Sequence, residues 1–239
     1  MVLQVVVLVA VAAVLALYVR HDLREYARFR ALTSTDDRVR SYRRWCLQGP
    51  LLFGGTALLA LAAAGRPVEA PLERAASSDL LTSVRDALSP GLVAAFATAV
   101  VVGSVVGAVA ARRGSGPATI GDVEPLLPRN RVELPWGGLL SVTAGVFEEL
   151  AFRLALPALV LAVTGSVVAA FVGPTVLFGL LHAYQGVGGV VGTTVLGALM
   201  VVVYLATGRL WVAIVLHVLL DLRALVLAPA LSGAWSRPA

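Results

Sequence analysis

Two adjacent glutamates and an arginine interrupt an otherwise apolar stretch, AGVFEELAFRLAL, at residues 144–156. A charge at the centre of a membrane helix costs roughly 2.5–3.5 kcal/mol on insertion scales, so such a cluster needs a reason to be there. Glu149 and Arg153 are four positions apart, so on a helix they share a face and can pair. Glu148 points about 100° away from Glu149 and is left to face another group. One carboxylate held in an ion pair and a second one free to contact another group form an arrangement suited to catalysis.

Two of the three histidines lie in later apolar stretches. His182 ends the segment FGLLH, four residues after Phe178, and His217 begins HVLLD, four residues before Asp221. We interpret Phe178 as a packing residue. Together with Glu148, these ionisable residues come from three apolar stretches, and ionisable residues inside membrane helices are functional-site candidates by default.

Two hydrolytic mechanisms fit these side chains. In the first, Glu148 is a general base toward a water that His182 also holds, and the water attacks a peptide carbonyl. His217, together with Asp221, then stabilises the oxyanion. In the second, Glu148, His182 and His217 bind Zn²⁺, because three protein ligands and an open water position are typical of catalytic zinc. The sequence leaves this choice open, although it contains no H-E-x-x-H helix and so is not a standard zincin.

The composition is that of an integral membrane protein. Of the 239 residues, 59% are hydrophobic and 14% are charged, and the mean hydropathy is +0.88. All 19 basic residues are arginines, and they are not clustered on a soluble face, so the net charge of +5 indicates membrane topology and no nucleic-acid binding. Cys46 is the one cysteine, which excludes an internal disulfide and a cysteine metal site.

Seven apolar stretches predict membrane-spanning helices, which need about 20 residues each. We place them at 2–19, 46–65, 91–111, 136–157, 166–184, 187–207 and 210–228. The first stretch has no basic segment before it and no small-residue cleavage site after it, so we interpret it as a transmembrane helix and not as a signal peptide. The predicted fold class is an all-α, polytopic transmembrane helix bundle.

The arginines predict how this bundle is oriented. Residues 20–44 hold eight arginines and residues 112–131 hold four, whereas the alternate connections hold fewer. The positive-inside rule therefore places these two stretches in the cytoplasm, with the N-terminus outside and the C-terminus inside. Glu148 and His217 then lie near the midplane, and their site opens toward the cytoplasm. The arginine-only, Ala-, Val- and Gly-rich composition indicates a GC-rich genome and hence a bacterial plasma membrane.

The chain divides into four parts. Residues 1–113 form a front three-helix membrane region with an Arg-rich loop, and residues 114–135 a cytoplasmic linker too rich in Pro and Gly to be one continuous helix. Residues 136–228 form a four-helix catalytic core, followed by a C-terminal tail at 229–239. Within the front region, residues 68–89 predict either an amphipathic helix on the outer surface or an ordinary connector.

The ordered motifs resemble those of the CPBP intramembrane proteases, which include type II CAAX prenyl endopeptidases and bacteriocin-processing or self-immunity proteins. The family pattern is E-E-x-x-x-R on one helix, F-x-x-x-H on the next, and H-x-x-x-N or H-x-x-x-D on a later one. Here these read EELAFR (148–153), FGLLH (178–182) and HVLLD (217–221), and LLPRNRVELPW looks like the usual lead-in. The likeness covers about residues 124–225.

The resemblance implies that Glu148 activates water together with His182, while His217 and residue 221 bind the oxyanion. The resemblance implies that Glu149 and Arg153 support the site without taking part in the reaction. At position 221 the best-known prenyl proteases have Asn. Asp221 donates to an oxyanion only when it is protonated, and as a carboxylate it could instead orient His217 or contact a metal.

We therefore predict a CPBP-type intramembrane endopeptidase, glutamate-type or metallo-type, that cuts a membrane-embedded or membrane-presented peptide. Its expected partners are the lipid bilayer and a membrane protein, lipidated peptide or leader peptide; a bacterial source makes a prenylated substrate unexpected. One alternative is a non-catalytic membrane binding or immunity protein on the same fold. Another is a proton-coupled transporter, against which stands the lack of an inverted repeat.

Overall fold

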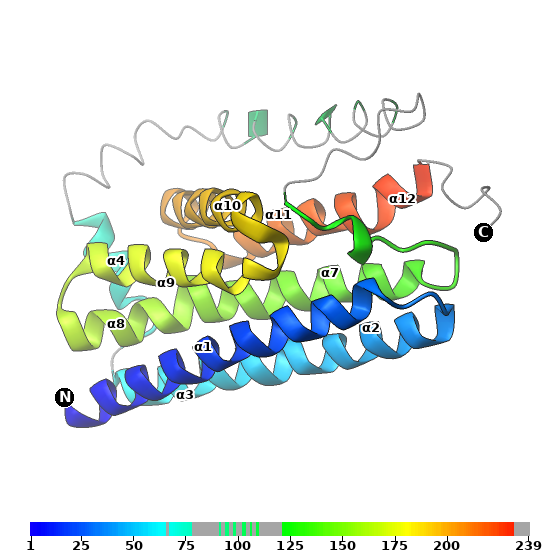
Figure 1. Ribbon diagram of the computed structural model, residues 1–239. Helices are drawn as coiled ribbons and strands as arrows, with labels where there is room; N and C mark the ends of the chain where they lie inside the picture. Colours follow the sequence, from blue (N-terminus) through cyan, green and yellow to red (C-terminus); the bar gives the residue numbers. More distant parts are fainter. Residues whose placement is uncertain are drawn as a thin grey trace.

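The chain forms a bundle of helices (Figure 1). The computed structural model describes residues 1–65, 67–77 and 121–231, with eight scattered positions between 91 and 109. In these described residues there are helices and turns but no strand, which confirms the all-α prediction. Most helices run side by side, while α10 crosses them at a steep angle. Of the 21 residues of the span predicted at 91–111, the eight scattered positions are described and the other thirteen lie outside the described residues.

Within each described part short turns join the helices, and three helical runs continue through π-helical segments without a break. In chain order the elements are α1 (Val2–Arg30), α2 (Thr35–Gly49), π-helical η1 (Pro50–Gly54), α3 (Gly55–Ala64), α4 (Ala70–Ala76), 3₁₀-helical η3 (Glu124–Leu126), α7 (Leu134–Glu149), π-helical η4 (Leu150–Ala155), α8 (Leu156–Thr164), α9 (Val167–Leu181), 3₁₀-helical η5 (Ala183–Gln185), α10 (Gly186–Thr207), α11 (Leu210–Leu222), π-helical η6 (Arg223–Leu227) and α12 (Ala228–Leu231).

The chain is an integral membrane protein. Four helical stretches of the described residues are long and apolar enough to cross a bilayer: Val2–Arg30, Thr35–Ala64, Ala183–Thr207 and Leu210–Leu231. The apolar α9 is shorter. The α7–η4–α8 stretch is one continuous helical run that carries the charged first motif. The predicted count of seven spans is therefore approximate, although each predicted stretch within the described parts is helical.

The Arg-rich segment at 20–44 is a helical hairpin, not the loop expected from the sequence. α1 continues to Arg30, and residues 31–34 join it to α2. Arginine is a good helix former, so its charges end the apolar stretch without ending the helix. Asp36 and Asp37 lie in the first turn of α2, where carboxylates stabilise a helix start. The helices therefore extend beyond the apolar stretches that the sequence delimits.

The described end of the linker lies against this hairpin. As predicted, residues 121–133 form no continuous helix. The side chain of Arg38 is completely buried and forms an ion pair with Glu133, its Nε lying 3.0 Å from Oε2. The same guanidinium donates to the carbonyls of Pro125 and Leu127 and to the hydroxyl of Tyr42. One side chain thus holds the linker, α2 and the start of α7 together.

Substituting Arg38 by methionine is expected to destabilise the protein by about 3–5 kcal/mol, because Glu133 would be left as a buried charge without its cation. The matched control is Arg40→Gln, since Arg40 pairs with Asp37 at the surface. An exposed pair contributes about 0.2–1 kcal/mol. Denaturant unfolding of the two variants in detergent measures the difference, and equal losses would show that the Arg38 pair is no more important than a surface pair.

The front and back helices pack directly on each other. α1 and α3 contact α8, and α2 contacts α7. Leu15 of α1 and Phe53 of η1 share a buried apolar cluster with Phe152 and Phe178. α4, the described part of the segment predicted at 68–89, packs through Ala75 against the ends of α9 and α10. The division of the chain into a front region and a catalytic core stays a prediction.

Candidate active site

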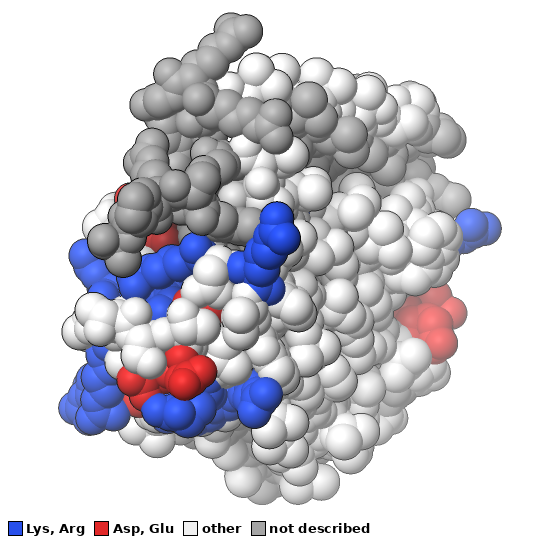
Figure 2. All heavy atoms as spheres, turned by 90° about the vertical axis from the view of Figure 1, so that its right-hand side faces the viewer, with Lys and Arg blue, Asp and Glu red and all other residues white. Residues whose placement is uncertain are grey.

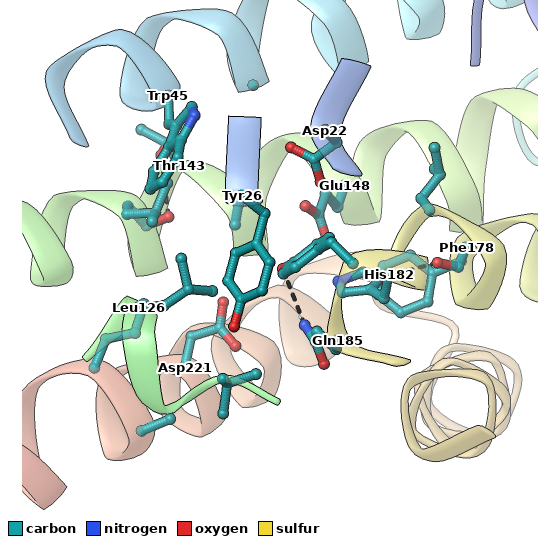
Figure 3. A pocket seen from close by; sticks show the side chains of 18 of the residues that line it. Asp22, Tyr26, Trp45, Leu126, Thr143, Glu148, Phe178, His182, Gln185 and Asp221 are labelled. Atoms are coloured by element: carbon teal, nitrogen blue, oxygen red, sulfur yellow. Dashed lines mark hydrogen bonds between the residues drawn. The ribbon is translucent and has the colours of Figure 1, made fainter. Parts of the chain in front are cut away.

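The predicted catalytic residues line one pocket of about 210 Å³ inside the bundle. Glu148 comes from α7, His182 from the end of α9, and His217 and Asp221 from α11. Figure 3 shows Glu148, His182 and Asp221 around this pocket. Residues far apart in the sequence are therefore brought together as expected, and the arrangement of each side chain indicates what it can do.

The first motif divides its two glutamates as the helical spacing predicts. Glu149 is fully buried and pairs with Arg153, whose Nε lies 3.2 Å from Oε2 of the carboxylate. Glu148 instead lines the pocket, with a side chain 13% exposed. The guanidinium of Arg153 lies over the ring of Phe178, 4.4 Å from its centroid. Phe178 therefore does more than pack the core, because its ring covers the buried guanidinium of Arg153 and contacts the ring of His182.

Glu149 has a second partner that the sequence analysis did not identify. Its Oε1 lies 2.7 Å from Nδ1 of His217, so the carboxylate joins Arg153 and the histidine. A carboxylate at Nδ1 fixes the proton on that nitrogen and orients the ring. The Nε2 of His217 then faces the pocket, 3.8 Å from Glu148 and 3.7 Å from Asp221. Glu149, and not Asp221, makes the hydrogen bond that holds His217.

His182 is fixed by the backbone of its own helix. Its Nδ1 lies 2.8 Å from the carbonyl oxygen of Phe178, which can only accept, so Nδ1 carries the proton. In the neutral ring the Nε2 is therefore an acceptor that can take a hydrogen bond from a water molecule. Glu148 and His182 thus present two acceptors to the same pocket, as a shared catalytic water requires.

Close packing of α7 on α11 makes these contacts possible. A methyl group placed on Gly145 would lie 2.5 Å from a side-chain carbon of Val218, so only glycine fits there. Gly145 is one turn before Glu149, and Val218 directly follows His217. The π-helical segment η4 begins directly after the glutamates, and such segments are frequent at functional sites. The glycine therefore sets the helix separation at which Glu149 can reach His217.

The structure adds pocket residues from outside the motifs. α1 contributes Tyr18, Asp22 and Tyr26, and the turn after α9 contributes Tyr184 and Gln185. The hydroxyl of Tyr26 donates to the backbone carbonyl of Asp122, and Gln185 donates to the Tyr184 hydroxyl at 2.9 Å. The α1 residues recur every four positions, which is a helical signal, but Asp22 and Tyr26 lie beyond the predicted end of the first span at residue 19, in the stretch expected to be an Arg-rich loop.

Several residues of the pocket are of types that bind zinc. In the described parts of the chain, no group of three or more His, Cys, Asp or Glu side chains is arranged to hold a metal ion. The zinc ligands expected in the alternative mechanism, Glu148, His182 and His217, do line one pocket, but they do not form such a group.

Comparison with known protein families finds a match over the part of the chain that carries the motifs. Residues 130–223 match the family of Rce1-like type II CAAX prenyl endopeptidases. The matched stretch contains all three motifs and ends just after Asp221. No curated protein and no solved structure matches the chain. The match confirms the resemblance to the CPBP proteases and supports a CAAX-type intramembrane endopeptidase in general.

Proposed function

Because residues 130–223 match the Rce1-like endopeptidases, we propose that this protein is an intramembrane endopeptidase whose attacking water is held by Glu148 and His182. The observation that supports this most is that both side chains line one pocket whose wall also carries the free Nε2 of His217. From three helices, Glu148 supplies a general base, His182 an acceptor that holds the water, and His217 a potential donor to the oxyanion. The substrate is a peptide embedded in the membrane or presented at it.

The reaction follows from these positions. Glu148 takes a proton from the water, and the resulting hydroxide attacks the carbonyl carbon of the scissile peptide. The carbonyl oxygen becomes an oxyanion, which His217, protonated on both ring nitrogens, stabilises through its Nε2–H. The carboxyl of Glu148 then returns its proton to the leaving nitrogen, and the C–N bond breaks. One water is consumed, and the products are a carboxylate and an amine.

His217 performs this role only if its ring is held still. Glu149 accepts from Nδ1 and Arg153 pairs with the other oxygen of the same carboxylate, so the ring has a fixed and buried support. Asp221 is too far from Nε2 for a hydrogen bond and is one-third exposed. We infer that Asp221 contacts the substrate or the oxyanion, in its protonated form, and does not orient His217.

Of the two mechanisms, the arrangement favours the metal-free one. The lack of a three-ligand group among the described side chains supports it. We expect 1,10-phenanthroline and EDTA to leave the rate of cleavage within about twofold, because no step uses a metal. Elemental analysis of the same sample should give well under one zinc per chain. Inactivation by chelator that added zinc reverses would establish the metallo-type enzyme instead.

We also propose that the site faces the cytoplasm from a bacterial plasma membrane. Figure 2 looks onto the end of the bundle where α1 turns into α2, and there the arginines and acidic residues gather. The pocket is lined on this side by Trp45 and by linker residues Val123, Leu126 and Leu127. If the arginine-rich end lies inside, the N-terminus is outside. Protease accessibility of a tag at residue 1 in intact cells and inverted vesicles tests the orientation.

Hydrolysis by the purified protein tests the proposed function. The substrates are membrane-inserting peptides in lipid nanodiscs, and the readout is mass spectrometry of the products. Cleavage that depends on Glu148 supports an endopeptidase. Tight binding of peptides without cleavage by the intact protein would instead support the non-catalytic binding or immunity protein.

A further inference from the structure

The part of the pocket wall formed by α1 carries a carboxylate without a described cation. Asp22 lies on α1, outside the family-matched stretch, and its carboxyl group and that of Glu148 both line the pocket (Figure 3). Among the residues that the structure describes, Asp22 forms no hydrogen bond or ion pair. The neighbouring charge that acts on it, Glu25, has the same sign. A partly buried carboxylate without a partner is costly, so its position needs a reason.

The described lining of the pocket is acidic. It includes three carboxylate residues, Asp22, Glu148 and Asp221, and no arginine; the chain has no lysine at all. The buried cation nearest to the site, Arg153, is already paired with Glu149. His217, protonated on both ring nitrogens, lies 3.8 Å from Glu148 and 3.7 Å from Asp221, so the charge that would balance Asp22 comes from the molecule that enters the pocket.

Aromatic rings stand beside Asp22. Tyr18, Tyr26 and Tyr184 line the same pocket, and the ring centroids of Tyr26 and Tyr184 are 5.1 Å apart. Tyr18 and Tyr184 both lie within electrostatic reach of Asp22 and of Glu148. A carboxylate flanked by aromatic faces is suited to a cation, which gains both an ion pair and cation–π contacts. A wholly apolar substrate group would leave Asp22 desolvated and unpaired.

We propose that Asp22, with Tyr18 and Tyr184, forms a specificity subsite for a basic side chain of the substrate, arginine or lysine, near the bond that is cleaved. This proposal rests on the proposed endopeptidase function. Basic residues concentrate where membrane helices leave the bilayer on the cytoplasmic side. The substrate class is therefore the cytoplasmic juxtamembrane segment of a membrane protein or membrane-bound peptide. Asp22 binds the basic side chain of the substrate, and Glu148 activates the attacking water.

The test uses the full-length protein in nanodiscs and a set of matched quenched-fluorescence peptides. One position at a time, on each side of the cleaved bond, carries arginine, lysine, citrulline, methionine or glutamate. Citrulline keeps the shape of arginine without its charge. At one position, arginine or lysine is expected to raise kcat/KM at least about tenfold over citrulline, because a desolvated ion pair replaces an unpaired carboxylate. Peptides with free and with acetylated N-termini show whether a terminal amine can serve as the cation instead.

Variants of Asp22 assign the preference to this residue. Asp22→Asn is expected to cleave the arginine and citrulline peptides alike, and Asp22→Arg to prefer the glutamate peptide. Asp36→Asn, at an exposed residue of α2 outside the pocket, is the matched control and should keep the preference for arginine. Asp22→Glu keeps the charge and should also keep the preference.

Either of two results overturns the subsite: the wild-type protein cleaves arginine and citrulline peptides equally at every position, or Asp22→Asn retains the preference. Both leave the endopeptidase function standing. If no peptide is cleaved, the proposed function fails. Binding of the same peptides to Glu148→Gln protein, measured by fluorescence anisotropy, then still decides whether arginine is preferred over citrulline. The wild-type comparison needs no variant, so it holds even if Asp22→Asn does not fold.

Discussion

Replacing Glu148 by glutamine is expected to lower kcat/KM for peptide cleavage by about 10²–10⁴-fold, the usual contribution of a general base. The amide keeps the size of the side chain and can still contact the groups of the pocket wall, but it cannot take a proton from water. The bundle should stay folded, because Glu148 forms no close hydrogen bond with a described residue and lies 3.8 Å from Nε2 of His217. Initial rates at several substrate concentrations, with unfolding measured on the same sample, separate chemistry from stability.

The matched control for this change is Glu73→Gln. Glu73 is an exposed glutamate of α4, away from the pocket, and its amide variant should cleave at the wild-type rate. Wild-type activity in Glu148→Gln would remove Glu148 from the mechanism and leave His182 or a metal to activate the water.

The second large effect is expected at Glu149, which serves two partners. Glu149→Leu should destabilise the protein by about 3–5 kcal/mol, because Arg153 would be a buried cation without a carboxylate. It should also lower the rate of cleavage about 10²-fold or more, because Nδ1 of His217 would lose the acceptor that orients the ring. Both losses are measured on one preparation, by denaturant unfolding in detergent and by initial rates below the unfolding transition.

A double variant separates these two roles. Glu149→Leu/Arg153→Met replaces the buried ion pair by apolar groups of similar size, a change that is often neutral or stabilising. Stability should therefore return while activity stays low, since His217 still lacks its partner. If activity returns together with stability, the contact between Glu149 and His217 has no role in the reaction, and the loss in the single variant is structural.

Local helical geometry explains what could be predicted from the sequence. Spacing of three or four residues decides which side chains share a helix face, so the pairing of Glu149 with Arg153 and the separate direction of Glu148 follow from the motif alone. Apolar length likewise located the helices of the described regions. The resemblance then indicated that three separate stretches meet, which periodicity by itself cannot show.

Contacts between helices account for what was missed. Which histidine Glu149 reaches depends on how closely α7 and α11 approach, and that distance is set by Gly145 against Val218. Glycine is common in membrane helices, so its presence did not distinguish this crossing from others. Asp22 was missed because a change from apolar to charged residues marks the membrane surface, whereas helix α1 continues past it to Arg30.

Cleavage in water enriched in ¹⁸O tests the central claim most directly. If Glu148 and His182 deliver a water to the peptide carbonyl, each turnover of the wild-type protein places one ¹⁸O in the new carboxyl group of the N-terminal fragment. Glu148→Gln protein, treated in the same way, should give no labelled fragment above background. Equal labelled cleavage by the wild-type and variant proteins would contradict the assignment of Glu148, and the absence of any labelled fragment from the active wild-type protein would contradict hydrolysis by a bound water.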